Sequence, residues 1–136
     1  MSQVTASLVK ELREKTGVGM MDCKTALKEN NGDIEASIDW LRTKGIAKAA
    51  KKEGRIASEG LIAVEKIDNT ASIIEVNSET DFVARNEDFQ NVVKKLSILS
   101  IKSNNLEELL DKELDNENIK VKDYITEMIA SIGENI

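Results

Sequence analysis

The chain has 136 residues, a formal charge of −6, no His, no Pro and one Cys. One Cys excludes an internal disulfide and is typical of a reducing compartment. Without His, the chain can form no Ser-His-Asp or Cys-His triad and no imidazole metal site. With only four aromatic residues, a stacking platform for single-stranded nucleic acid is disfavoured. The composition therefore favours an interaction protein over an enzyme, and we expect no metal site and no cofactor.

The net charge is unevenly distributed along the chain. Residues 1–57 hold 11 Lys and Arg against 8 Asp and Glu, a net of +3, whereas residues 58–136 hold 8 against 17, a net of −9. This shift predicts two units with a boundary near residue 55. The basic excess gathers at Lys44, Lys48, Lys51, Lys52 and Arg55. A solvated helix face and a site for an acidic protein surface are both open interpretations. The acidic remainder argues against nucleic acid.

Three short helices are predicted in the first 45 residues. The first covers 5–16, with Thr5 or Ser7 as its cap and Gly17 at its end. The second covers 20–30, and the third begins after Asp33, a favourable N-cap residue, and ends at Gly45. An Ala-rich fourth helix is expected over 46–53. The apolar positions at helical spacing form the expected core of this bundle: Val4, Leu8, Val9, Leu12, Met20, Cys23, Ala26, Leu27, Ile34, Ile38 and Leu41.

The second half begins with branched aliphatic residues at 60–67 and 71–77, which predict a β-hairpin. A helix start is expected near 78–81 and another after Asn86, followed by a short helix over about 106–114 and a last one from Val121 to Gly133. Two strands alone make no stable sheet, so a further strand or a cover of helices is needed. The predicted fold class is α+β, mostly helical overall.

Three features could carry function. Cys23 lies on the inner side of its helix and is interpreted as a small buried hydrophobe. At helical spacing Met20 would face the core with Cys23, and Met21 would point elsewhere. Core packing of both and an adaptable apolar patch for a partner are the two interpretations. Phe82, in the segment Thr80-Asp81-Phe82-Val83, either packs inside behind a helix start or is presented to a partner's pocket beside Asp81.

Four segments of the chain resemble bacterial elongation factor Ts. They are TASLVKELREKTGVGMMDCKTAL at 5–27, GDIEASIDWLRTKGIAKAAKKEGRIASEG at 32–60, EVNSETDFVARNEDFQ at 75–90 and IGENI at 132–136. The resemblance implies a ubiquitin-associated-like three-helix domain with a following basic helix over 1–55. Residues 56–136 would be the N-terminal part of the family's core domain, a small β-hairpin and helix subdomain that ends short of the usual length.

The resemblance also implies a function. The protein would be a translation elongation factor and guanine-nucleotide exchange factor in protein biosynthesis. It would bind the GTPase elongation factor Tu in its GDP form and release GDP. It would not be an enzyme, and it would bind neither nucleic acid directly nor a membrane. Because the family match begins by residue 4, a cytoplasmic location is expected. The alternative is a short binding module for the same GTPase without full exchange activity.

The resemblance assigns partner contacts residue by residue. Asp81 and Phe82 match the pair that disturbs the partner's Mg²⁺ and phosphate site. The other matching positions are Met20, Met21, Lys24, Lys52 and Ile132. Since the hairpin lacks a third strand, self-association through an unpaired edge of the core domain is a further expectation.

Overall fold

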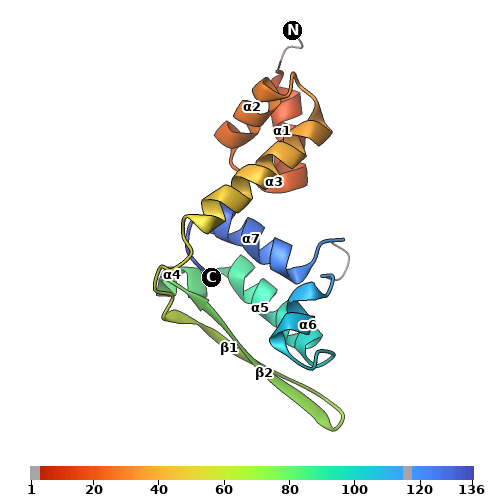
Figure 1. Cartoon of the computed structure of the whole chain (residues 1–136), viewed down its shortest axis with the longest axis vertical. Helices are drawn as coiled ribbons and strands as arrows, with labels where there is room; N and C mark the ends of the chain where they lie inside the picture. The colour runs from red at the N-terminus through yellow and green to blue at the C-terminus, as the bar shows by residue number, and fades with distance from the viewer. Residues whose placement is uncertain (1–3, 115–117) are drawn as a thin grey trace.

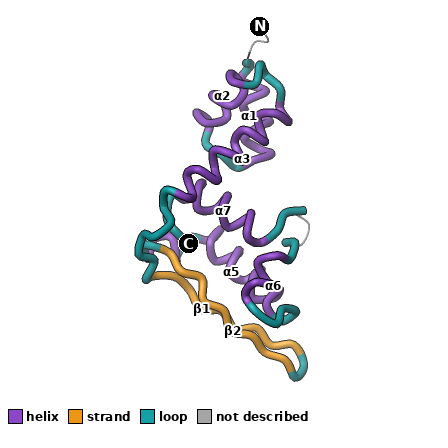
Figure 2. Tube along the Cα trace, in the orientation of Figure 1, coloured by secondary structure: helices purple, strands orange, loops and turns teal. Residues whose placement is uncertain are grey.

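The computed structural model describes residues 4–114 and 118–136. Helices and one hairpin follow one another along the chain (Figures 1 and 2). The elements are α1 (Ala6–Thr16), α2 (Met20–Glu29), α3 (Ile34–Ala50), β1 (Glu59–Ile67), β2 (Thr70–Ser78), α4 (Asp81–Ala84), α5 (Glu87–Ser100), α6 (Leu106–Asp111) and α7 (Val121–Ile132). The mostly helical α+β class predicted from the sequence is confirmed.

Local capping signals set the ends of the first helices. The Thr5 hydroxyl accepts a hydrogen bond from the Leu8 amide at 3.3 Å, and the Asp33 carboxylate accepts one from the Ala36 amide at 2.9 Å. Gly17 ends α1 with φ +67°, a left-handed conformation that glycine adopts at little cost. The three helices enclose a small interior of Leu12, Cys23, Ala26, Leu27 and Leu41. The predicted bundle core is thus confirmed except at Met20.

Helix α3 is longer than the sequence predicted. It continues without a break through Gly45 to Ala50, so the separate basic helix expected over 46–53 is wrong. Gly45 is not among the glycines with positive φ, and a Cβ built on it would lie 3.6 Å from the Ala130 Cβ of α7. The glycine is therefore a close-contact position between two helices, and no helix ends there.

The β-hairpin is confirmed with a two-residue turn. Ile67 pairs with Thr70, and Asp68 occupies the turn at φ +52°, a conformation that Asp tolerates better than most residues. Among the described residues the sheet has these two strands only. Helix α5 covers one face of it, as the instability of a bare hairpin requires.

The second interior lies between the hairpin, α5, α6 and α7. Its buried residues are Phe89, Val92, Val93, Leu96, Leu99, Leu109, Leu114, Val121 and Met128. The strands contribute alternate residues, Leu61, Ala63, Ile74 and Val76, while their neighbours Ile62, Val64 and Ile73 are exposed on the opposite face. The period of two in the strand sequences accounts for this division.

Helix α3 joins the two interiors by packing against α7 (Figure 1). The Arg42 guanidinium lies 3.6 Å from the Glu127 carboxylate across this contact. Within the bundle, the Lys48 ammonium donates to the Asp22 carboxylate at 2.7 Å and so links α3 to α2. None of the described helices is long and apolar enough to cross a bilayer.

Candidate partner-binding site

Phe82 is the most unusual side chain in the second half of the molecule. It lies on α4, a helix of four residues, and 81% of it is exposed. Burying an aromatic ring of this size is favourable, so an exposed one marks a surface that a partner can cover. The interpretation in which Phe82 packs inside is wrong. Asp81 beside it is half-buried and lies 3.2 Å from the Arg85 guanidinium, one turn along the chain.

Helix α4 is fixed at both ends by polar contacts. The buried Ser78 hydroxyl donates to the Thr80 carbonyl at 2.9 Å just before the helix. Just after it, the Asn86 side chain accepts from the Asp88 and Phe89 amides at 2.9 and 3.2 Å and starts α5. Asn86 is the cap that the sequence predicted. The chain therefore changes direction before α4 and again between α4 and α5. Phe82 lies between these two turns and faces solvent.

A second group of exposed apolar atoms lies on α2. Met20 is 58% exposed and Met21 is 71% exposed, so the prediction that Met20 faces the core is wrong, as is core packing of both. The buried side of α2 begins only with Cys23 and continues with Ala26 and Leu27. Met20 belongs to the first turn, before that packing starts. The flexible thioether side chains suit an adaptable contact, and Lys24 is exposed one turn further on.

The segment after α3 adds a residue that the sequence did not single out. Ile56 is 84% exposed, beside the half-buried Lys52 and the exposed Arg55. Ile56 lies between the helix predicted over 46–53 and the strand predicted from residue 60, so no predicted periodic pattern indicated whether its side chain is buried or exposed. In Figure 1 this segment runs along the same side of the view as α2 above it and α4 below it.

Arg55 connects this segment to the residues around α4. Its guanidinium donates to the Glu79 carboxylate at 3.4 Å, and its carbonyl accepts from the Asn135 side chain at 2.9 Å. The Asn135 amide in turn donates to Glu79 at 2.7 Å. The Asn135 hydrogen bond, aided by Arg55 and by the charge of Lys52, holds the pKa of Glu79 below its ordinary value, despite partial burial. Residues from three parts of the sequence thus meet behind Phe82.

Ile132 is less exposed than Met20, Met21, Lys24 and Phe82. It is half-buried at the end of α7 and packs against the second interior. Gly133 follows with φ +86° and turns the chain, which brings the C-terminal residues beside α4 (Figure 1). Ile132 therefore lies near the Phe82 segment through its neighbours in the chain, with part of its side chain already covered.

The structure divides the predicted contact residues into two groups. Lys52, Asp81, Phe82 and Ile132 gather around Glu79 and the chain end, whereas Met20, Met21 and Lys24 lie apart on α2. The residues that connect the first group, Arg55, Glu79, Glu134 and Asn135, were missed as site residues. Their contacts join positions more than 20 residues apart, and no local pattern in a sequence carries that information.

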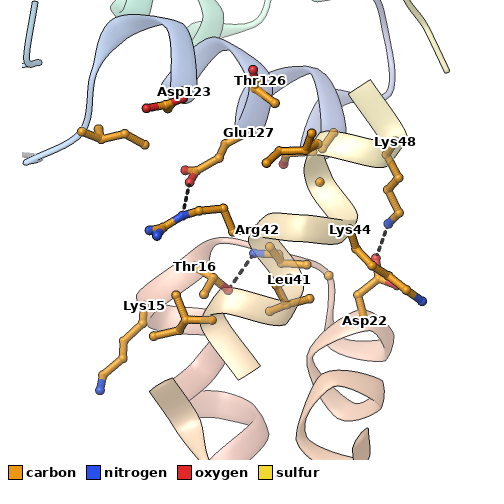
Figure 3. A pocket seen from close by; sticks show the side chains of 18 of the residues that line it. Lys15, Thr16, Asp22, Leu41, Arg42, Lys44, Lys48, Asp123, Thr126 and Glu127 are labelled. Carbon is orange, nitrogen blue, oxygen red and sulfur yellow. Dashed lines mark hydrogen bonds and ion pairs between the residues drawn. The ribbon is translucent and has the colours of Figure 1, made fainter. Parts of the chain in front are cut away.

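A cleft of about 930 Å³ lies between α3 and α7 (Figure 3). Glu127 points from α7 toward Arg42, and Lys48 points toward Asp22. Charges of both signs line it, and none of the predicted contact residues does. The described residues contain no group of three potential metal ligands among His, Cys, Asp and Glu. Cys23 is fully buried, as predicted, with its thiol 3.5 Å from the Val18 carbonyl.

The amino-acid sequence of the chain is similar to known proteins of one family. Residues 79–136, which include α4 and the chain end, match the family model described as Elongation factor TS. The whole chain is 56% identical over 137 aligned positions to the elongation factor Ts of Azorhizobium caulinodans and to that of Methylobacterium sp. (strain 4-46), and 54% identical to that of Parvibaculum lavamentivorans. It covers 45%, 45% and 44% of these relatives, so it spans less than half of their length.

Proposed function

The chain belongs to the elongation factor Ts family, and from that premise we propose that it binds the GTPase elongation factor Tu in its GDP-bound form and promotes the release of GDP. The observation that carries this proposal is the exposed Phe82 on its short helix, inside the segment that matches the family. The factor acts by binding and displacement and is not an enzyme. Residues 1–55 and 56–136 form its two units, and it works in the cytoplasm, without direct contact with nucleic acid or a membrane.

Phe82 acts as a wedge in the proposed mechanism. Its ring enters between helices of the GTPase, and Asp81 forms a hydrogen bond beside it. The wedge shifts the element that holds Mg²⁺ and the phosphates, so GDP leaves faster. A factor that bound the GDP-bound and nucleotide-free forms equally would shift nothing. The contacts of Phe82 must therefore be stronger with the nucleotide-free GTPase.

The α2 group has a different part in the proposal. Met20 and Met21 form an apolar patch that holds the partner, and Lys24 on the same helix attracts an acidic surface. Lys52, which lies near Glu79, attracts an acidic surface beside the Phe82 segment. This patch contributes to affinity, whereas Phe82 contributes to the rate of release. Ile132 adds a smaller apolar contact because part of it is already buried.

The release of labelled GDP from elongation factor Tu tests the proposal. The wild-type chain at micromolar concentration is expected to accelerate release. Phe82→Ala is expected to lower the acceleration at least tenfold, equal to about 1.4 kcal/mol or more. Its unfolding midpoint should be unchanged because the ring is exposed. Leu106→Ala removes another exposed apolar side chain, 68% exposed, and is the matched control with full activity expected.

A second experiment separates the two groups of contacts. Replacing Met20 and Met21 by Ala is expected to weaken binding roughly tenfold while the maximal rate of release at saturation stays near wild type. Phe82→Ala should show the reverse. If both variants changed only the affinity, the wedge role of Phe82 would be lost.

A binding module without full exchange activity is the second candidate, because the exposed Met20 and Met21 on α2 offer a contact surface separate from Phe82. It predicts measurable binding to elongation factor Tu with an unchanged rate of GDP release. Binding by calorimetry together with the release assay therefore distinguishes the two candidates.

Self-association through an edge of the hairpin is a further proposal. Each strand of the two-stranded sheet has one side without a strand partner among the described residues. Such edges favour pairing with another chain. Sedimentation analysis over a range of concentrations should then show a dimer, and a monomer at all concentrations would contradict it.

A further inference from the structure

Helix α4 is too short to hold its own position. It has four residues, and helices of this length are unstable without support from the rest of a protein. Its N-cap residue Thr80 makes no side-chain hydrogen bond to the helix. Two backbone hydrogen bonds of the helical type span it: the Ala84 amide donates to the Thr80 carbonyl at 3.4 Å, and the Arg85 amide donates to the Asp81 carbonyl at 3.0 Å. The orientation of Phe82 must therefore be set by contacts from outside the helix.

Glu134 supplies three such contacts. One carboxylate oxygen accepts hydrogen bonds from the Glu79 and Thr80 amides, both at 3.0 Å, and the other accepts from the Thr80 hydroxyl at 2.6 Å. In a capping box, a carboxylate inside the helix bonds the N-cap amide in the same way. Here the carboxylate comes from 54 residues further along the chain. A negative charge at this end of a helix also interacts favourably with the backbone dipoles.

A reciprocal contact secures the same two segments. Glu79 accepts from the Asn135 amide at 2.7 Å while Glu134 accepts from the Glu79 amide. Each segment thus offers a carboxylate to the backbone of the other. Charge-assisted hydrogen bonds of this kind are stronger than those between neutral groups. Gly133 allows the turn that brings Glu134 off the end of α7 and toward Thr80.

We infer that Glu134 is a positioning residue, whose carboxylate fixes the backbone at Glu79 and Thr80 and thereby holds Phe82 in the orientation in which the partner meets it. This inference rests on the proposed function for its consequence in nucleotide release. The positioning itself is a property of the free protein. Glu134 acts through α4 and requires no contact with the partner.

The free protein gives the first test. Removal of the side chain in Glu134→Ala is expected to speed hydrogen exchange of the Glu79 and Thr80 amides at least tenfold. The NMR order parameter of the Phe82 amide should fall from about 0.85, typical of rigid backbone, to below about 0.6. Glu134→Gln is the matched control, since its carbonyl can accept from both amides and its NH₂ can donate to the Thr80 hydroxyl. It should keep most of the protection. Unchanged exchange in Glu134→Ala would overturn the inference.

A milder variant covers the case in which Glu134→Ala unfolds the chain. Thr80→Val keeps the shape of the side chain and removes only the hydroxyl contact at 2.6 Å. The order parameter at Phe82 should fall by a smaller amount, with the amide contacts of Glu134 retained. If Thr80→Val left that order parameter unchanged and Glu134→Ala unfolded the whole chain, Glu134 would be a general stability residue and the inference would be wrong.

Nucleotide release gives the second test. Glu134→Ala should reduce the acceleration of GDP release several-fold, with weaker loss in Glu134→Gln. When Phe82 is already Ala, the same change should have little further effect, because residues that act as one unit are not additive. Equal effects with and without the Phe82 ring would contradict positioning. If the wild-type chain does not accelerate release at all, the proposed function fails, while hydrogen exchange still decides the role of Glu134.

Discussion

The helices that carry the exposed Met20, Met21 and Phe82 are supported in different ways. The helix that carries Met20 and Met21 belongs to a bundle of three helices that follow one another in the sequence, and it packs there through Cys23, Ala26 and Leu27. The helix that carries Phe82 depends on a carboxylate 54 residues away. A patch built on local contacts tolerates changes elsewhere in the chain. The orientation of Phe82, which depends on distant contacts, can change through a substitution elsewhere in the chain while α4 itself is unchanged.

The largest effects are expected from substitutions that truncate one buried side chain in the interior of one region at a time. Phe89→Ala deletes a fully buried ring from the second interior and is expected to cost about 3–5 kcal/mol. The expected result is loss of the hairpin region in urea well before the bundle. Circular dichroism follows the whole chain, and the emission of Trp40, which packs on the bundle interior, follows the bundle.

Leu27→Ala is the matching change in the bundle, expected to cost about 2–5 kcal/mol. It should shift the Trp40 transition first. If both variants shifted both signals equally, the two regions would unfold as one unit, and the contrast between local and distant support would not extend to stability.

The next test removes a local cap. Asp33→Ala deletes the hydrogen bond to the Ala36 amide and should lower the free energy of unfolding of the bundle by about 1 kcal/mol. Amide exchange at Thr80 should be unchanged, since α4 draws no support from α3's cap. Glu35→Ala, exposed in the same turn, is the control. Faster exchange at Thr80 in Asp33→Ala would show that the wedge also depends on the bundle.

A smaller effect of opposite sign is expected where the two regions meet. Gly45→Ala should stabilise α3 by about 0.5–1 kcal/mol, because Ala favours a helix interior and its Cβ would lie at an ordinary contact distance from Ala130. The thermal midpoint measures this gain. Gly45→Leu should reverse it by pushing α3 away from α7. A loss of stability in Gly45→Ala would mean that the helices are already in closest contact.

The smallest expected effect is a change in melting temperature that depends on pH. The pKa of Glu79 is lowered by the Asn135 amide and by Arg55, so its contribution to stability is present above its ordinary value of 4.5 and is lost as the pH falls through the lowered value. Glu79→Gln should therefore have a lower melting temperature than wild type near neutral pH, and the difference should close in acid. Glu53→Gln, an exposed change of the same kind, is the control.

Local signals in the sequence were sufficient for most of the fold. Asp33 and Asn86 are caps as predicted, and of the two candidates Thr5 and Ser7 the structure has Thr5 as the cap of α1. The aliphatic residues of the hairpin alternate between its two faces, as the period of a strand requires. Gly45 was misread because a glycine after a helical pattern resembles an ending. In the structure the helix continues past it, and it faces Ala130 of α7, about 85 residues later in the chain, with room for a Cβ at ordinary contact distance.

The sequence identified residues of the candidate site such as Phe82, but it did not show the distant contacts that hold them in place. Phe82 stood out as a rare aromatic at a helix start, yet its exposure could not be separated from burial by sequence alone. Met20 was assigned to the core because periodicity does not show where neighbouring helices stop covering a helix. Glu134 gave no signal, since a carboxylate that caps a distant helix is indistinguishable in sequence from a solvated one.

The contact between Glu134 and Thr80 also has a consequence for the order in which parts of the chain fold. Closing a loop of 54 residues costs conformational entropy before the hydrogen bonds at its ends can form. We therefore expect this contact to form late in folding. The helices of the bundle need no such closure and can form first. On a growing chain the N-terminal part folds earliest, and Phe82 is synthesised well before its support. We therefore expect Phe82 to acquire its final orientation after the bundle has folded.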